Sequence, residues 1–411
     1  MTLSLRKKHC LGKSKTTTED GLPTVSVYRS ASDIPPSWDA LLPAKKRLLQ
    51  SDYLRALEAA PPAGMKFAYL LFHDKENVVI GLAYCQIQRF SAEKSIRYDE
   101  KGQTPGLLES VGRYLQRLVA SKFEFNTLVC GNLLFTGEHG FYFKANTLKE
   151  EEQIRVVNCA LENLQEQLQK DSLPVSVVLY KEFYDQSRTS FAGLKQDSYK
   201  EFTIQPNMIL DIRDHWESFE DYMGDLLSKY RVRTKRARKK FQAIERKELS
   251  AEDIAEHLPH LYGLYQSVVG NSGFNVINLS EQYLLSLKKH LPQEFSVHAY
   301  LDEGKIVAFY TILMTGQEME AHFLGFERSY NRSHQIYLNI LYDLVQHGIQ
   351  RGAERVIFAR TALEIKSSVG AIAHEMYCYM RHRNAISNNL LQPLLDYLRP
   401  DTDWHPRHPF K

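Results

Sequence analysis

The chain lacks the features of a secreted or membrane-spanning protein. Its 411 residues contain only five cysteines, which are odd in number, widely spaced and without a C-x-x-C pair. This pattern argues against a disulfide framework and a thiolate zinc site, and it favours a reducing compartment. Residues 1–20 are polar and basic without the apolar segment of a signal sequence. Apolar runs such as 78–84 have the length of a strand. We therefore expect a cytoplasmic protein, and we also consider contact with the anionic surface of the inner membrane.

Strong charge and nucleotide-binding motifs are also missing. The net charge is only +3, so no field of the whole molecule points to DNA. The chain has no Walker loop and no G-x-G-x-x-G placed after a strand. His405 and His408 have no accompanying ligands, so we expect no metal site and no permanently bound cofactor. What is abundant are aromatic residues, 23 Tyr and 20 Phe, which supply large anchors for a core.

Length and patterning predict two α/β domains with mixed sheets. A chain of 411 residues is too long for one ordinary core. Strand-like and helix-like segments alternate, and hairpin strands, a helix and a further strand follow one another in each half. We expect a disordered lead over 1–21, an N-terminal domain over 22–212, and a C-terminal domain over 213–411 that carries the active site. Expected strands include 66–73, 78–89, 295–302, 305–315, 318–325 and 376–381, and expected helices include 104–121, 218–244, 332–350 and 386–398.

The most informative stretch is 355–371, where a buried-looking strand runs directly into charged residues. In open α/β sheets, ligands bind beyond the carboxyl ends of the strands. One acid among two bases suits a site that holds an anion and also moves a proton. We therefore predict a catalytic group made of Arg360, Glu364 and Lys366, with His322 of strand 318–325 as a further candidate for the general base.

Two of these residue types also have a structural interpretation. Thr361-x-x-Glu364 fits a capping box, in which Thr361 would cap a short helix that ends at Gly370. Capping leaves Arg360 and Lys366 without a role. His322 could equally be a core histidine whose ring nitrogens are satisfied. Both interpretations stay open at this point.

A second feature is the basic segment 229–240. Apolar residues at helical spacing predict a stripe that packs inward, made of Tyr222, Leu226, Tyr230, Ala237, Phe241 and Ile244. Lys229, Arg233 and Arg236 share one flank, which would bind phosphates of a cofactor, an RNA or lipid headgroups. The alternative is a solvated helix face.

A third feature follows strand 318–325, where the chain enters the long helix expected over 332–350. The free N–H groups at the start of a helix favour anions. We predict that this helix start supplements the phosphate-binding residues through Arg328, Tyr330, Asn331 and Arg332.

Four segments together resemble GNAT-superfamily N-acyltransferases, in particular the bacterial Fem-like branch with two GNAT-type domains in tandem. They are residues 228–238, 304–310, 331–337 and 358–366, and the terminal 407–411 is similar to that group as well. The motifs cover about residues 215–411, whereas 22–210 matches by the order of elements alone. The usual pyrophosphate loop of the superfamily is missing, and so is a coiled-coil arm typical of some tRNA-dependent Fem ligases.

The resemblance implies an acyltransferase. An acyl group would pass from a thioester of coenzyme A or an acyl carrier protein to an amine of a small molecule or aminolipid, by direct attack. Glu364 or His322 would take the proton, while Arg360 and Lys366 would hold an anionic group. Two alternatives remain, a peptidoglycan-bridge ligase that uses aminoacyl-tRNA and a non-catalytic acyl-binding scaffold.

Overall fold

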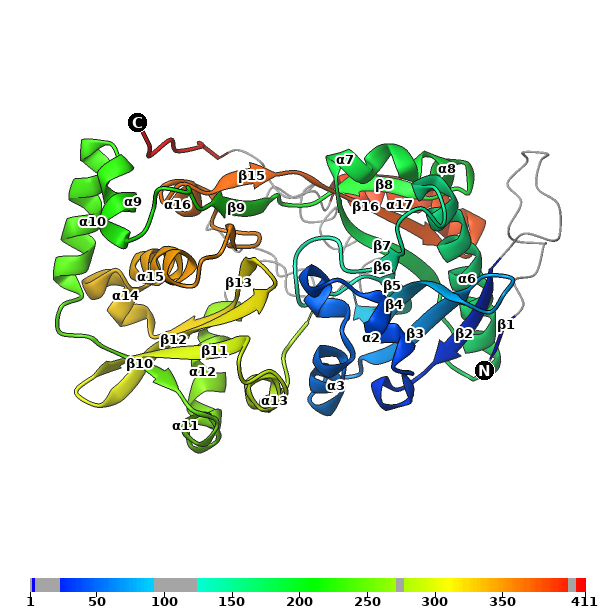
Figure 1. The fold of residues 1–411 in the computed structure, drawn as a ribbon, viewed down its shortest axis with the longest axis horizontal. Helices are drawn as coiled ribbons and strands as arrows, with labels where there is room; N and C mark the ends of the chain where they lie inside the picture. The colour runs from blue at the N-terminus through cyan, green and yellow to red at the C-terminus, as the bar shows by residue number, and fades with distance from the viewer. Residues whose placement is uncertain (1, 4–22, 92–123, 271–276, 398–403) are drawn as a thin grey trace, which may run out of the picture.

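The computed structural model of the protein describes residues 2–3, 23–91, 124–270, 277–397 and 404–411. It contains two mixed β-sheets, each accompanied by helices, as the mixed α/β class predicts (Figure 1). Within the expected lead, Thr2–Leu3 form β1 against the next strand. The expected helix 104–121 lies outside the described residues.

The first sheet is built mainly from the first half of the chain. After β1 its strands follow in the spatial order β2 (Thr24–Tyr28), β3 (Lys66–His73), β4 (Val79–Ser91), β5 (Glu124–Cys130), β7 (Val177–Tyr184), β16 (Met376–His382) and β8 (Lys200–Thr203), and β6 (Phe141–Phe143) pairs with β4. Among the described strands of this sheet, only β5 and β7 run parallel. The accompanying helices include α2 (Ser37–Leu41), α3 (Ser51–Ala59), α6 (Glu150–Lys170), α7 (Asp185–Arg188), α8 (Ala192–Gln196) and α17 (Ala385–Tyr397).

The second sheet has the order β10 (Glu245–Leu249), β11 (Phe295–Asp302), β12 (Lys305–Thr315), β13 (Glu318–Phe326), β14 (Arg355–Ile357), β9 (Asn207–Asp211) and β15 (Ile372–His374). One face packs against α11 (Ala251–Glu256), α12 (Leu258–Val269) and α13 (Tyr283–His290). The other packs against α9 (Phe219–Asp225), α10 (Ser228–Lys240) and α15 (Ile336–Gln350). Glu303 and Gly304 turn the β11–β12 hairpin with positive φ angles of 49° and 80°, as a tight two-residue turn requires.

Each sheet receives one strand from the far side of the expected boundary at residue 212. β9 follows β8 along the chain, but it lies between β14 and β15 in the second sheet. Conversely, β16 follows β15, but it lies between β7 and β8 in the first sheet. Figure 1 shows these two crossings side by side at the top of the molecule. The exchange holds the ends of β7 and β14 close to the junction of the two sheets.

Two helices expected to be continuous are broken. The stretch 218–244 divides into α9 and α10, because the backbone N–H of Leu227 donates to the carbonyl of Pro409 in the C-terminal tail (2.8 Å). The stretch 332–350 divides into α14 (Arg328–His334) and α15 at Gln335, whose φ is 53°. The predicted apolar stripe is nevertheless confirmed, since all six of its members are buried.

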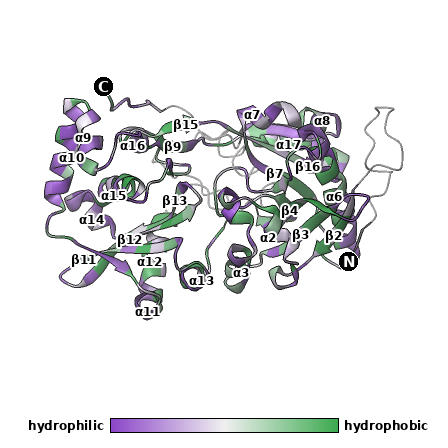
Figure 2. Cartoon of the chain, in the orientation of Figure 1, coloured by the Kyte–Doolittle hydropathy of each residue, from purple (hydrophilic) through white to green (hydrophobic). Residues whose placement is uncertain are grey.

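A shared core joins the two sheets through α3 and α13. Buried side chains of β3, such as Tyr69, belong to the same cluster as Leu287 of α13 and Phe309 of β12. The Ser286 hydroxyl of α13 donates to the carbonyl of Ala56 in α3 (2.7 Å). In Figure 2 the strands of both sheets carry most of the hydrophobic colour. This packing fixes the position of one sheet relative to the other.

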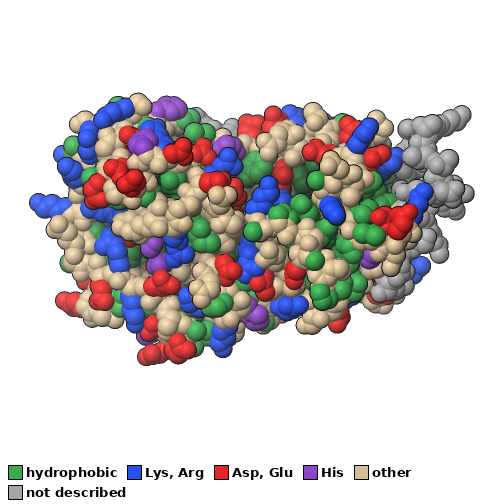
Figure 3. Space-filling view, viewed as in Figure 1, with side chains coloured by type: hydrophobic (Ala, Val, Ile, Leu, Met, Phe, Trp, Pro, Cys, Tyr) green, Lys and Arg blue, Asp and Glu red, His purple; other side chains and the backbone are tan. Residues whose placement is uncertain are grey.

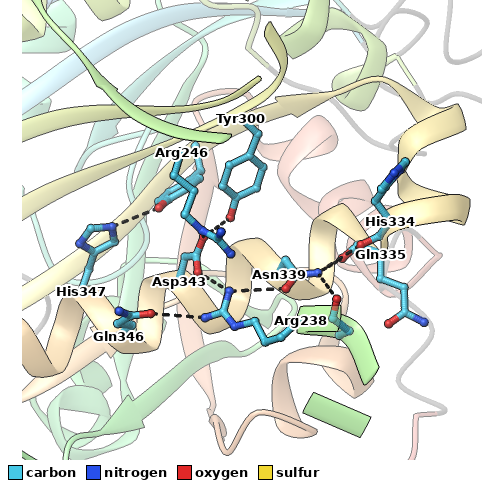
Figure 4. Close-up of polar contacts among 11 residues, drawn as sticks. Arg238, Arg246, Tyr300, His334, Gln335, Asn339, Asp343, Gln346 and His347 are labelled. Carbon is cyan, nitrogen blue, oxygen red and sulfur yellow. Dashed lines mark hydrogen bonds and ion pairs between the residues drawn. The ribbon is translucent and has the colours of Figure 1, made fainter. Parts of the chain in front are cut away.

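A buried acid anchors α10 to α15 and β10 (Figure 4). Asp343 of α15 is 3% exposed and pairs with Arg238 of α10 and with Arg246 of β10 (2.8 Å). The hydroxyl of Tyr300 also donates to it. Burial alone would raise the pKa of Asp343, but the two guanidinium groups outweigh burial and lower the pKa. The carboxylate therefore stays charged and holds α10 in place.

Candidate functional site at the junction of the two sheets

The predicted strand end meets the first sheet through an ion pair. Arg360 follows β14, and its guanidinium lies 3.1 Å from Oε1 of Glu182 in β7. Glu182 is completely buried and also pairs with Lys181 (2.7 Å). It accepts a further hydrogen bond from the backbone N–H of Gly137 (2.9 Å). Burial would raise the pKa of Glu182, but Arg360 and Lys181 outweigh burial and lower it. A charged cluster thus sits between the sheets.

The backbone around this cluster is strained. Ala359, Thr361 and Ala362 have φ angles of 57°, 68° and 48°, and Glu182 has a φ of 60°. Residues with side chains rarely adopt this left-handed region, and a β-branched residue such as Thr does so least readily. Strain of this kind persists only where surrounding contacts enforce it, and it concentrates at functional sites.

Lys366 is the buried support of the strained loop. Its Nζ donates to the carbonyl oxygens of Ala359 (3.2 Å) and Arg360. Burial, and then the charge of Arg360, lowers the pKa of Lys366 to about 7. Lys366 therefore holds the loop through hydrogen bonds while its charge is only partly retained near neutral pH.

Because the pKa of Lys366 is lowered in the folded protein, we predict that the free energy of unfolding depends on pH. Between pH 7 and 10 the unfolded chain keeps the proton that the folded protein releases, so the free energy of unfolding rises with pH. We expect the wild type to gain up to about 1.4 kcal/mol per pH unit relative to Lys366→Met over this range. Denaturant unfolding at several pH values measures this difference, with Lys239→Met as an exposed control. Parallel curves for wild type and Lys366→Met would contradict the prediction.

Glu320 of β13 is a carboxyl group at the same junction. It is 4% exposed, and among the described residues its carboxyl group makes no hydrogen bond or ion pair. Burial, then the charges of Glu318 and Glu182, raises the pKa of Glu320 well above its usual value, with Lys181 opposing. Its backbone pairs with Ile357, the last residue of β14. β13 continues to Phe326 without β14, so the two strands part at Glu320.

His322 lies two residues further along β13. Its ring stacks on Phe135 with centroids 3.9 Å apart, and its Nε2 lies 2.8 Å from the hydroxyl of Tyr283. Burial lowers the pKa of His322 well below its usual value, so the ring is neutral at physiological pH. The carbonyl of Phe135 accepts from Lys181 (2.7 Å), which connects His322 to the charged cluster.

Glu364 lies on the other side of this region and does not form the predicted capping box. The helix α16 (Leu363–Ser367) begins after Ala362, and no side chain caps it, because Ala362 and not Thr361 occupies the N-cap position. Glu364 instead accepts from the backbone N–H of His405 (3.1 Å) and from Arg407 (3.3 Å). These two hydrogen bonds lower the pKa of Glu364, and the one from His405 has the larger effect. The capping-box interpretation is therefore wrong.

Two of the predicted phosphate-binding residues line an open groove of about 490 Å³. The groove lies between α10, α16 and the C-terminal tail, and its walls are Lys229, Tyr230, Arg233, Glu364, Ile365, Ser368 and Arg407. Arg236 is exposed on α10 but does not line the groove. The structure thus brings Lys229 and Arg233 together with Glu364, which the sequence had placed in a different site.

The residues at the start of α14 have mixed roles. The hydroxyl of Tyr330 donates to Asp302 (2.7 Å), and the side chain of Asn331 accepts from the N–H of Tyr337 (3.0 Å). Both contacts are structural, because they fasten the β11–β12 turn and the first turn of α15. Arg328 and Arg332 are exposed, and neither has a carboxylate partner among the described residues.

Sequence reasoning missed Glu320, Glu182 and Lys181. The signal for Glu320 was present, since an acid occupies an inward position between apolar residues of a strand. Glu182 and Lys181 lie in β7 of the first sheet, and only the packing of the two sheets brings them to Arg360. Arg407 was noted for its resemblance alone, and its place in the groove depends on the course of the tail.

Comparison with known protein families decides the fold. Residues 228–367 match the family model described as acetyltransferase (GNAT) domain. This segment is a GNAT domain. It includes α10, the splayed strands β13 and β14, Arg360 and Lys366, and it supports an acyltransferase.

Solved structures extend the likeness to most of the chain. The crystal structure of FemX is 11% identical, covers 90% of this chain and 99% of its own, and gives a TM-score of 0.50. A tandem GNAT protein from the clavulanic acid biosynthesis pathway (8% identical, 88% and 99% covered, TM-score 0.47) and L-PGS from Bacillus licheniformis (13%, 86% and 97%, 0.46) also match. No curated protein matches the chain in sequence. The GNAT-type, Fem-like fold expected from the sequence is thus confirmed, and at these identities the likeness concerns the fold alone.

No helix in the described part of the chain is both long and apolar enough to cross a membrane. No group of three or more metal-ligating side chains occurs among the same residues.

Proposed function

We propose that the protein is an N-acyltransferase that moves an acyl group from a thioester to an amine, with its catalytic centre at the junction of the two sheets. The observation that carries this proposal is the carboxyl group of Glu320. It is buried, its pKa is raised, and it lies where β13 and β14 part within the GNAT domain. A carboxyl group with a raised pKa is a better general base than an ordinary one, since its pKa is closer to that of an ammonium group.

The reaction is a direct attack. Glu320 takes a proton from the acceptor ammonium, and the free amine forms a C–N bond with the thioester carbonyl carbon. The attacking nitrogen then gives up a second proton as the C–S bond breaks, and this proton goes to the leaving thiolate, while Glu320 returns the first proton to solvent. His322 is the second candidate for the base, because its neutral ring can accept a proton at Nε2 in place of the contact with Tyr283, but burial lowers its pKa and makes it a weaker base than Glu320. Glu364 is less suited, since hydrogen bonds from the tail lower its pKa and stabilise its charged form.

Arg360 and Lys366, the cations of the junction, bind a ligand and position the loop around it. Arg360 is about one-third exposed, so its guanidinium can bind an anionic group of the acceptor or donor while it remains paired with Glu182. Lys366 is a positioning residue, because its hydrogen bonds fix the loop that carries Arg360. Among the remaining predicted phosphate-binding residues, Arg328, Arg332 and Arg236 are exposed and free to contact the donor.

A thiol-release assay tests the proposal. The purified protein is incubated with acyl-coenzyme A of increasing chain length and with a panel of amines, including amino acids and aminolipids. We expect thiol release that depends on the amine, together with a mass increase of the acceptor equal to the acyl group. If no thioester turns over with any amine, the donor assignment is wrong.

Aminoacyl-tRNA is the second donor to test, because six exposed cations of α10 have no carboxylate partner among the described residues. They are Lys229, Arg233, Lys235, Arg236, Lys239 and Lys240. Such a surface can bind an RNA backbone. If the protein transfers an aminoacyl group from aminoacyl-tRNA, and if tRNA binding weakens steeply as the salt concentration rises, then aminoacyl-tRNA and not a thioester is the donor. Absence of transfer from either donor would favour a non-catalytic acyl-binding protein.

A further inference from the structure

The groove beside α16 gathers positive charge that the chain itself does not neutralise. Three cations line it, two from α10 and one from the tail, against the single carboxylate of Glu364. Lys229 and Arg233 are exposed and have no carboxylate partner in the described ranges. α10 contains no acidic residue, and Arg238, which points inward, is the one cation of this helix that pairs with an acid in the described structure. In Figure 3, Lys and Arg side chains appear along the end of the molecule where Figure 1 places α10.

The C-terminal tail forms one wall of the groove and is held firmly. Glu364 accepts from both His405 and Arg407, and the backbone N–H of Arg407 donates to the hydroxyl of Ser367 (3.0 Å). Further along, Phe410 packs 5.8 Å from the ring of Tyr222 in α9. The tail therefore holds Arg407 in a defined position. Its guanidinium group donates one hydrogen bond to Glu364 and has further N–H groups that can bind a ligand.

The end of the tail packs into a specific position next to Gly370. A Cβ atom placed on Gly370 would come within 2.4 Å of the Phe410 ring, so only glycine allows this close approach. Gly370 also has a φ of 103°, which favours glycine for its backbone as well. The close contact between Gly370 and Phe410 indicates that the fold specifies the position of the tail, and with it that of Arg407.

We propose that this groove binds a phosphate ester of the acyl donor, with Lys229, Arg233 and Arg407 as its cationic ligands. Two guanidinium groups and one ammonium group suit a phosphate, because forked donors match its oxygens and several cations match a charge above one. The volume of about 490 Å³ falls within the range of small-molecule sites. The inference rests on the proposed function for the identity of the ligand, although binding can be measured without catalysis.

The groove and the junction are connected through α16. This helix has five residues, about 7 Å at the usual rise per residue. Lys366 points to the strained loop, whereas Glu364 and Ile365 face the groove. A phosphate bound in the groove would thus lie one short helix away from Arg360, and the donor's acyl end could extend toward the junction.

Titration calorimetry with inorganic pyrophosphate, coenzyme A and vesicles of phosphatidylglycerol in phosphatidylcholine tests the groove. We expect Arg233→Ala and Arg407→Ala each to weaken binding about tenfold or more, as loss of a charge-assisted hydrogen bond does. Lys235→Ala is the matched control, since it removes a cation from the same helix outside the groove, and we expect it to change affinity less than twofold. Arg407→Lys, with its melting temperature, separates loss of binding from loss of folding.

The three ligands identify the source of the phosphate. Binding of pyrophosphate and coenzyme A with this residue dependence supports a soluble donor. Vesicle binding alone with the same dependence would overturn the acyl donor as the source of the phosphate and assign the groove to a lipid headgroup. Equal weakening by Lys235→Ala, no binding of any ligand, or binding of tRNA alone would overturn the groove as a phosphate-ester site.

Failure here and failure of the proposed function can be told apart. Glu320→Gln removes the proposed base but leaves the groove intact, so it should lose turnover and keep pyrophosphate binding. If Glu320→Gln loses turnover and no ligand binds the groove, only the groove inference is wrong. If ligands bind as expected and Glu320→Gln turns over normally, only the proposed catalytic centre is wrong.

Discussion

Glu320→Gln should lower amine-dependent thiol release by about 10² to 10⁴-fold, the range typical of loss of a general base. Glutamine keeps the size of the side chain but cannot take the proton of the acceptor ammonium. Because burial raises the pKa of Glu320, turnover of the wild type should rise with pH as this carboxyl group loses its proton. The variant should lack that rising limb. Rates measured from pH 5 to 9 with one thioester and one amine test both statements.

Glu318→Gln is the matched control for this prediction. Glu318 lies two residues earlier on β13, its side chain is 39% exposed, and it pairs with Arg355 at 3.6 Å. Its loss should change turnover by no more than a few-fold. His322→Asn completes the set, because a large loss in this variant with full activity in Glu320→Gln would transfer the role of the base to His322.

Asp343→Ala should lower the free energy of unfolding by about 3 kcal/mol, since removing one partner of a buried ion pair leaves the other charges uncompensated. Asp343 is 3% exposed and receives Arg238, Arg246 and the hydroxyl of Tyr300. Its loss leaves two guanidinium groups and a buried hydroxyl without their acceptor. α10 should loosen first, because Arg238 is its polar anchor to α15. Urea unfolding monitored by circular dichroism measures the loss.

Glu327→Ala is the control for the buried acid. Glu327 pairs with Lys305 at 2.6 Å on the surface, where the Lys305 side chain is 61% exposed. Exposed pairs contribute less than about 1 kcal/mol, so this variant should unfold close to the wild type. If Asp343→Ala and Glu327→Ala were equally stable, the buried network would not anchor α10.

The local patterns of the chain were enough to predict most elements. Period-two alternation and the Asp302–Lys305 turn predicted the hairpin that became β11 and β12, because both signals act within a few residues. The buried apolar stripe between residues 222 and 244 followed in the same way from helical spacing. The helix breaks at Leu227 and Gln335 were not predictable, since one depends on a contact with Pro409 and the other on a left-handed residue.

The sequence by itself determined the GNAT-type fold and the basic flank of α10, and it predicted a functional strand end at residues 358–366. Only the tertiary structure decided how these parts combine. The exchange of β9 and β16 brings Glu182 to Arg360, which lie 178 positions apart along the chain. Residues of the C-terminal tail form hydrogen bonds with Glu364, and Arg407 of the tail lines the groove. The physical reason is that burial and ion pairing, which set the pKa of Glu320 and of Lys366, arise from residues that are distant in sequence and meet only in the folded protein.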